Sequence, residues 1–482
     1  MKNFLKVRFL AMAEYSSELE LCSFGLTKSF LKVRFLAMAE YSSELELCSF
    51  GLTKSFPYLF LLFLSTLLIA CSDKKPETEQ PDSGMARRTV LVYMCAENSL
   101  GAWHCHTTDS AEIMDGHAFI SPADRLLMFI DDDKKPRLYS VTAGREEPLL
   151  LKQWDYDICS ASPERFAEVL GVMKEKCPAQ EYGLVMWSHA DGWIPATETD
   201  YDAFENPAVS SLTPHTLSFG IDSGPDGKLG DKGANMNVED MAQAIDAAGI
   251  HCRFIFFDAC LMQNLEVAYA LRNQTDYIVA SPMAIPSAGA YYTHQMEKGL
   301  FSADPADIAR TYLQDVTDTD LRYIYGDYGL AIACLQTDKL AHLAETLKNA
   351  LPTSSLADGQ TADMNGVLNY QTYCSKYYYR PHNYDARQSI TRILAPADTA
   401  QVLRALDDVI VYHDATERYW IGPYNWDYQH VPIDTDNYRA VSMFVPQEVY
   451  TRNAKSTIHG DLNTAFRQTE WYSDAGFEVT GW

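Results

Sequence analysis

Short apolar runs alternate with amphipathic segments from residue 87 onward. Runs that are apolar almost throughout are typical of strands buried on both faces, and a 3.6-residue apolar period after a Ser or Asn is typical of a capped helix. The expected strands lie within 88–96, 125–133, 182–193, 251–262 and 276–282, and the expected helices within 110–117, 162–177, 237–249 and 263–274. This alternation predicts an α/β fold, with a mainly parallel sheet flanked by helices on both faces.

The pattern changes near residue 320. Tyrosine-rich stretches at 376–381 and 418–428 mix with helical patterns at 337–351 and 399–414, and a late strand is expected at 440–446. We therefore predict a main α/β domain over 87–320 and a C-terminal accessory α+β region over 321–482. The aromatic residues of this region are interpreted as packing residues.

The first 70 residues are interpreted as a duplicated leader plus a signal peptide. The segment 4–29 recurs unchanged at 30–55, which indicates a recent duplication or a misplaced start, with Met38 a plausible true start. The apolar run 56–70 has the length of a signal-peptide core and ends in Leu-Ile-Ala before Cys71, which resembles the lipobox of bacterial lipoproteins. The alternative is a buried core segment that happens to end in cysteine.

This resemblance implies that Cys71 is lipidated and becomes the mature N-terminus. The polar, Pro-containing segment 71–86 then forms a flexible tether. Acyl chains on Cys71 would anchor the chain stably. We therefore expect an extracytoplasmic protein of the bacterial cell envelope, lipid-anchored at the outer membrane.

Charge and cysteine content exclude two classes of protein. The formal net charge is -26, without a basic stripe, which argues against nucleic acid as a partner because phosphates need Lys and Arg. The cysteines that follow Cys71 are scattered without CxxC pairs, and a chain with 47% hydrophobic residues has no need of a disulfide framework. Most of these cysteines are therefore expected to be small buried side chains.

Two polar residues follow expected strands in a pattern that indicates nucleophilic catalysis. His189 comes just after the strand that ends at Trp187, and Cys260 comes just after the strand that ends near Phe257. If these strands are parallel neighbours, a thiol and an imidazole meet at one edge of the sheet. Cys260 is expected to open a helix whose dipole lowers the thiol pKa, and the N–H groups of Ala190 and Cys260 are expected to form an oxyanion hole.

An apolar block ending in His, followed by an apolar block ending in acid-Ala-Cys, resembles the caspase-like clan of cysteine peptidases. LVYMCAEN (91–98), LVMWSHADGW (184–193), FGIDSGPDGKLG (219–230) and FIFFDACLM (254–262) narrow the resemblance to the clostripain family. The resemblance implies a cysteine endopeptidase that acts on protein or peptide substrates, with the family's preference for basic residues at P1 as an expectation, and with the peptidase domain over 87–320.

The sequence departs from the family at two places. Ala190 stands where the family has Gly, and no carboxylate lies between Ser281 and Tyr292, where family members tend to carry an acid that receives a basic P1 side chain. Asp258 is the remaining candidate for this substrate-binding role, and the alternative is that it binds local backbone N–H groups. These departures support a second hypothesis, a catalytically weak or inactive surface lipoprotein that binds peptides or glycans.

The long polar stretch 196–235 between His189 and Cys260 is the expected place for activation by self-cleavage. Its basic residues are Lys228 and Lys232, so cleavage is expected after one of them, and the alternative is an intact surface loop.

No metal site or cofactor is predicted. The cluster of His104, Cys105, His106 and His117 lacks zinc spacing, and the acidic run 131–133 is interpreted as a solvated loop, with calcium possible but not predicted.

Overall fold

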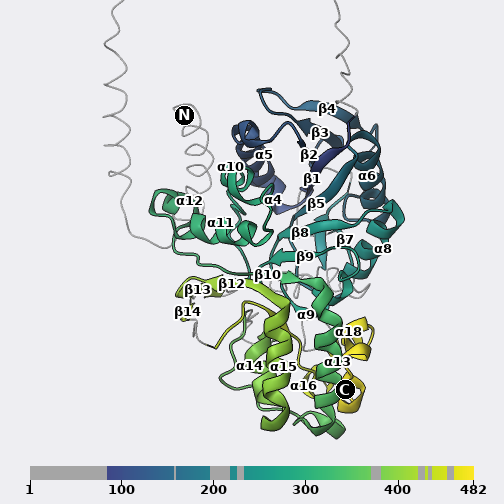
Figure 1. The fold of residues 1–482 in the computed structure, drawn as a ribbon, viewed down its shortest axis with the longest axis vertical. Coiled ribbons are helices and arrows are strands. Elements are labelled where there is room, and N and C mark those ends of the chain that lie inside the picture. The colour runs from purple at the N-terminus through teal and green to yellow at the C-terminus, as the bar shows by residue number, and fades with distance from the viewer. Residues whose placement is uncertain are drawn as a thin grey trace, which may run out of the picture. The chain divides into compact units, whose positions relative to one another are not determined.

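A nine-stranded sheet forms the centre of the part of the chain that the structure describes (Figure 1). The structure is a computed structural model, and it describes residues 84–156, 159–195, 218–224, 233–370, 382–421, 429–432, 437–452 and 461–482. From edge to edge the strands are β12 (Ile410–Ala415), β10 (Ala331–Gln336), β9 (Tyr277–Ala280), β8 (Cys252–Asp258), β5 (Ala179–Trp187), β1 (Ala86–Cys95), β2 (Asp124–Asp131), β3 (Arg137–Val141) and β4 (Leu149–Gln153).

The central strands β9, β8, β5, β1 and β2 are parallel, and the outer strands pair antiparallel. Alternate side chains of each central strand enter different hydrophobic clusters. Leu91 and Tyr93 of β1 lie in one cluster, whereas Val90 and Val92 lie in the other. This alternation explains why the strands are apolar throughout, since both faces of the sheet are covered.

Helices cover both faces (Figure 1). One face is covered by α6 (Pro163–Lys176), α8 (Val238–Ala248) and α9 (Leu265–Ala270), and the other by α5 (Cys105–Asp115), α10 (Tyr292–His294), α11 (Ala306–Thr317) and α12 (Arg322–Tyr325). The predicted α/β class, with a mainly parallel sheet between two helical layers, is confirmed.

The capping residues explain where several helices begin and end. The Ser162 hydroxyl accepts a hydrogen bond from the Arg165 N–H at the start of α6, which matches the predicted Ser cap. Gly249 ends α8 with φ +62°, a conformation that favours glycine. The helix expected within 263–274 is shorter, because Asn264 caps it and it ends at Ala270.

The region after residue 320 contributes β10 and β12 to the main sheet, so the sheet draws strands from both sides of the expected boundary. The helix predicted over 399–414 is wrong in its last part, since α15 (Pro396–Val409) is followed directly by β12. The run Ile410-Val411-Tyr412 is β-branched and aromatic, and it pairs with β10.

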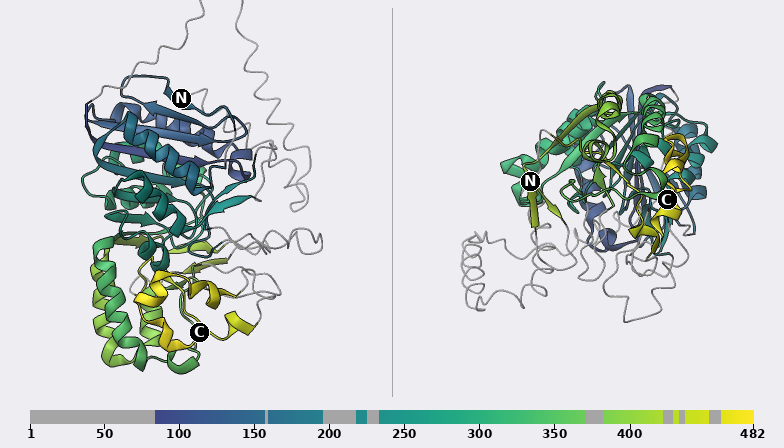
Figure 2. Two further views of the ribbon diagram at one scale, coloured as in Figure 1. Left: turned by 90° about the vertical axis from the view of Figure 1, so that its right-hand side faces the viewer. Right: turned by 90° about the horizontal axis from the view of Figure 1, so that it is seen from below.

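The other elements of this region lie beside the β9–β12 edge of the sheet (Figure 2). They are α13 (Leu340–Ala350), α14 (Ala386–Ile393), α16 (Val449–Arg452), α17 (Leu462–Phe466), α18 (Glu470–Asp474), and the strand pairs β11 (Tyr384–Asp385) with β15 (Ser442–Met443) and β13 (Arg418–Ile421) with β14 (Gln429–Pro432).

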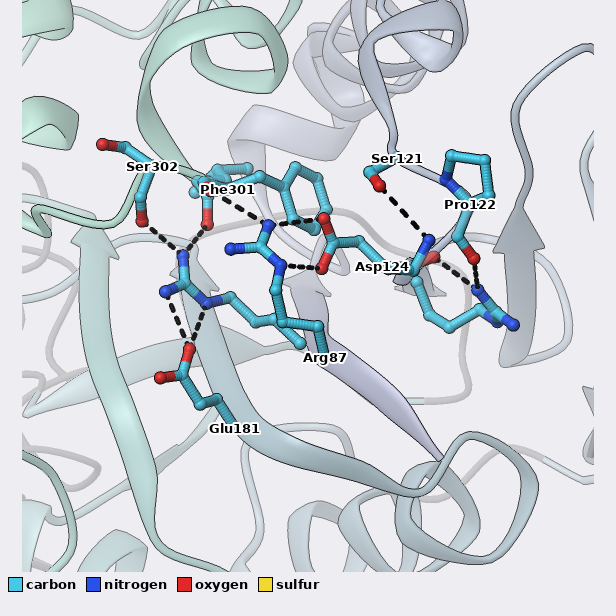
Figure 3. Close-up of polar contacts among 11 residues, drawn as sticks. Arg87, Ser121, Pro122, Asp124, Glu181, Phe301 and Ser302 are labelled. Carbon is cyan, nitrogen blue, oxygen red and sulfur yellow. Dashed lines mark hydrogen bonds and ion pairs between the residues drawn. The ribbon is translucent and has the colours of Figure 1, made fainter. Parts of the chain in front are cut away.

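Two arginines fix the start of β1 at the amino-terminal edge of the sheet (Figure 3). The Arg87 guanidinium binds both carboxylate oxygens of Asp124 on β2. Buried Arg88 donates to the carbonyl oxygens of Leu300 and Ser302 and to Glu181 on β5. These contacts lie at the opposite end of β1 from the carboxyl edge, where the candidate chemistry gathers.

Candidate active site at the carboxyl ends of β5 and β8

The parallel pairing of β5 with β8 brings His189 and Cys260 to equivalent positions beyond the ends of two neighbouring strands. Trp187 of β5 is in register with Asp258 of β8, and each candidate residue follows its strand by two positions. Neighbouring strands lie about 4.8 Å apart. The structure therefore places both residues just beyond the same edge of the sheet, where the sequence predicted them.

Cys260 lies in a turn and not at the start of a helix. The α9 helix begins five residues later, where the Asn264 side chain accepts from the Val267 N–H. The Ile285 N–H donates to the Cys260 Sγ at 3.4 Å. The pKa of this thiol is raised to about 11, chiefly by burial and in addition by the nearby Asp191 and Asp258 carboxylates, while the Ile285 N–H opposes them. The expectation of a helix dipole that lowers the pKa is wrong.

The turn that carries Cys260 packs directly against the loop that carries His189. Gly192 has φ +79°, and a Cβ there would lie 2.6 Å from the Asn264 side-chain nitrogen and 3.0 Å from the Leu261 carbonyl oxygen. Only a residue without a side chain fits this contact. Leu261 itself has φ +64°, which is rare for a residue with a Cβ and is held by its N–H bond to Met283.

The N–H of Ala190 points away from the neighbouring strand β6 (Phe219–Asp222). Strand β6 itself pairs with β7 (Ala234–Met236). Ala190 forms a bridge with Phe219 in which the Gly220 N–H donates to the His189 carbonyl and the Asp191 N–H donates to that of Ser218. In this antiparallel arrangement Ala190 belongs to a non-hydrogen-bonded pair. Its methyl group is buried in the hydrophobic core, so the extra carbon relative to glycine is accommodated.

The backbone N–H groups of Ala190 and Cys260 have no hydrogen-bond acceptor among the residues that the structure describes. They lie on the two loops that meet at Gly192. Two N–H donors on adjacent loops have the chemistry that a tetrahedral oxyanion requires.

Asp258 is buried beneath this edge, with 3% of its surface exposed. Its carboxylate accepts from the Ala290 N–H at 3.1 Å and from the Tyr292 hydroxyl at 2.8 Å. Burial raises its pKa to about 6, against the lowering effect of these two donors. A Cβ on Gly289 would lie 2.7 Å from the carboxylate, so the backbone at Gly289 lies directly against the Asp258 side chain. These contacts match the local backbone-binding alternative for Asp258.

Other buried polar residues at this edge were missed by the sequence analysis. The Trp187 Nε1 donates to Asp109 at 2.7 Å, and the Tyr292 N–H donates to Glu112 at 3.1 Å. Asp109 and Glu112 lie on α5, one helical turn apart. Charged residues on helices are usually solvated, so the two acids gave no signal by themselves. Their spacing of one helical turn is the signal that could have indicated them.

The acidic run after β2 is not the solvated loop that was expected. Asp131 and Asp132 are buried, and only Asp133 is exposed. Asp132 accepts from Arg137 at 2.7 Å and lies 3.1 Å from the His106 Nε2. These hydrogen bonds hold the pKa of Asp132 well below its usual range, although burial opposes them.

The described residues contain no cluster of three or more His, Cys, Asp or Glu arranged to hold a metal ion. In the same part of the chain, none of the helices combines the length and the apolar character that crossing a membrane requires. Cys71, Lys228 and Lys232 lie outside the described residues, so lipidation and self-cleavage stay predictions, as does the absence of a cofactor.

The comparisons with known proteins agree with this geometry. The fold, with His189 and Cys260 just beyond two neighbouring parallel strands, is the one found in solved C11 cysteine protease structures. The sequence model of the clostripain family matches residues 92–421, and the chain belongs to that family. It is therefore a cysteine peptidase by family. A comparison with curated proteins finds no match.

Solved structures with the same fold include proteases from two bacterial species. A secreted C11 cysteine protease from Bacteroides thetaiotaomicron, bound to an irreversible peptide inhibitor, is 24% identical with a TM-score of 0.65, covering 82% of this chain and 99% of that one. An inactive zymogen C11 protease from Parabacteroides distasonis is also 24% identical, with a TM-score of 0.63 and the same coverage. These likenesses establish the fold.

Proposed function

We propose that Cys260 is the nucleophile and His189 the general base and acid of a peptide-bond hydrolase. The observation that carries the proposal is the register of β5 and β8, which sets both residues two positions beyond paired strand ends. The Cys260 Sγ attacks the scissile carbonyl carbon and its proton passes to His189. The C–N bond then breaks and the proton leaves on the amine. Water hydrolyses the thioester, which restores the thiol.

The raised thiol pKa determines how this reaction begins. A thiol with a pKa of about 11 is protonated at neutral pH, so the resting enzyme holds little thiolate. His189 must therefore remove the proton as the sulfur attacks, and the N–H groups of Ala190 and Cys260 would stabilise the oxyanion that forms.

The preference at P1 follows from the state of Asp258. A carboxylate that binds a basic P1 side chain must be charged and reachable. Asp258 is enclosed by Gly289, Ala290 and Tyr292, and burial raises its pKa to about 6. We therefore expect Asp258 to hold the segment 289–292 in place and to give no strong preference for Arg or Lys at P1.

Two peptides that differ only at P1, with Arg or norleucine, test the activity and the preference together. We expect the purified protein to hydrolyse both, with kcat/KM values within about tenfold, since a buried charge pair would favour Arg by on the order of a hundredfold or more. Hydrolysis of neither peptide would contradict the peptidase and favour a binding protein. Hydrolysis of the Arg peptide alone would contradict the role given to Asp258.

The amino-terminal segment supports an extracytoplasmic location. The apolar run 56–70 followed by Cys71 has the pattern of a lipoprotein signal, and one of the similar solved structures is that of a secreted protease. We infer that the chain is exported, lipidated on Cys71 and held at the bacterial outer membrane by its acyl chains.

A serine at position 71 should release the protein from the membrane, because the hydroxyl cannot receive the thioether-linked lipid. We expect Cys71→Ser to move the protein from the membrane fraction to the soluble fraction in cells that export it. Cys48→Ser is the matched control, since Cys48 precedes the apolar run, and it should leave the distribution unchanged. A Cys71→Ser protein that stays with membranes after carbonate washing would refute the anchor.

A further inference from the structure

The Nε2 atom of His189 has a polar partner in the segment that follows β1. It lies 2.9 Å from the Ser99 hydroxyl oxygen, which is within hydrogen-bond distance. Ser99 is the first residue of the short helix α4 (Ser99–Ala102), which follows β1 directly. Both side chains are half-buried, so water competes with this contact only in part.

The position of Ser99 is fixed by the residue before it. The buried Asn98 amide donates to the carbonyl oxygens of Cys95 and Ile221 and to the hydroxyl of Ser188. Its oxygen accepts from the Leu100 N–H, which caps α4. Ser188 directly precedes His189 in the sequence. The hydrogen bonds of Asn98 therefore connect the turn that carries Ser99 to the loop that carries His189.

The turn between β1 and α4 also has no room to shift. A Cβ on Gly101 would overlap the Ala96 carbonyl oxygen, so the backbone of the turn lies in close contact with the end of β1. The Trp103 N–H donates to the Ser99 carbonyl at 2.9 Å. The hydroxyl is therefore presented to His189 by a rigid turn.

We propose that Ser99 is a positioning residue that fixes the ring orientation of His189; this rests on the catalytic role given to His189 above. The contact at Nε2 holds one edge of the imidazole ring, so the ring keeps its direction while it exchanges the proton with Cys260 and the leaving amine. The Ser99 hydroxyl can donate to Nε2 or accept from Nε2–H, so it holds the ring in either tautomer.

The same hydrogen bond is retained after proton transfer. The imidazolium carries protons on both nitrogens, and the hydroxyl can accept from Nε2–H. Ser99 therefore holds the ring in one orientation both before and after the thiol proton is transferred. Without the hydroxyl, this contact with the ring is lost.

The test compares Ser99→Ala, Ser99→Thr and Ser223→Ala in the full-length protein. Ser223 is the matched control, because its half-buried hydroxyl donates to the Glu97 carbonyl at 2.7 Å in the same region. We expect Ser99→Ala to lower kcat about tenfold with little change in KM, in proportion to one lost hydrogen bond. Ser99→Thr should restore most of kcat, and Ser223→Ala should match the wild type.

Each outcome separates this proposal from that of the catalytic pair. A wild-type protein without hydrolytic activity overturns the proposed function itself. An active wild type with an unchanged kcat in Ser99→Ala overturns the role of Ser99. A fall in kcat in Ser99→Ala with a lower melting temperature and no recovery in Ser99→Thr would assign Ser99 a structural role, and also overturns the proposal.

Discussion

Replacement of Cys260 by alanine should reduce peptide hydrolysis by at least about ten-thousandfold, because a covalent route cannot proceed without its nucleophile. Substrate binding should persist, since Cys260→Ala removes one sulfur atom and leaves the N–H groups of Ala190 and Cys260 in place. The measurement is the initial rate of peptide cleavage by purified variant and wild type at equal concentration. Far-ultraviolet circular dichroism verifies that the variant is folded.

Cys252→Ala provides the matched control for this loss. Cys252 lies at the opposite end of the same strand, β8, and it is completely buried. Burial raises the pKa of its thiol well above the usual range, so the group is inert. This variant should lose about 1–2 kcal/mol of stability and keep most of its kcat. Equal loss of activity in both folded variants would show that Cys260 is not the nucleophile.

The central part of the sheet and its active edge could be predicted from the sequence for a physical reason. Strands covered on both faces have apolar side chains at every position, and this makes β1, β5 and β8 visible as continuous runs. A polar residue just after such a run lies at the carboxyl edge by geometry alone. The positions of His189 and Cys260 at this edge were predicted from that rule, without any knowledge of the turns that carry them.

The turns themselves were not predictable in the same way. Whether a helix begins at Cys260 or at Leu265 depends on the Asn264 cap and on the bonds from Leu261 and Gln263 to the segment 281–283. These bonds join residues far apart in sequence. Ser99 was missed for the same reason, since its partner His189 is brought to it only by the pairing of β1 with β5.

The C-terminal region shows a different limit. The stretch 399–414 has a helical period in its first part and a β-branched run in its last, and the period of the first part was extended too far. Pairing with β10 decides the state of the last part. The region also reaches the active site, because Phe444 packs on Trp193 of the His189 loop with ring centroids 5.2 Å apart.

Glu266 joins this C-terminal segment to the helix that follows Cys260. Its side chain is 2% exposed and accepts from the Phe444 N–H at 2.8 Å. Burial raises its pKa from 4.5 to about 8, against the lowering effect of the Phe444 N–H. The folded protein therefore keeps this proton up to about pH 8, whereas the unfolded chain releases it near pH 4.5. The unfolded state binds fewer protons in this window, so stability falls as pH rises through it.

Glu266→Gln should remove that pH dependence, because the amide is neutral at every pH and its oxygen can still accept from Phe444. We expect the free energy of unfolding of the wild type to fall by about 3 kcal/mol more than that of Glu266→Gln between pH 5 and pH 8. Urea unfolding at unit steps of pH measures the difference. Glu164→Gln, on the exposed first turn of α6, removes the same charge without burial and should follow the wild type. Parallel curves for wild type and Glu266→Gln would mean that Glu266 is ionised in the folded state throughout this range.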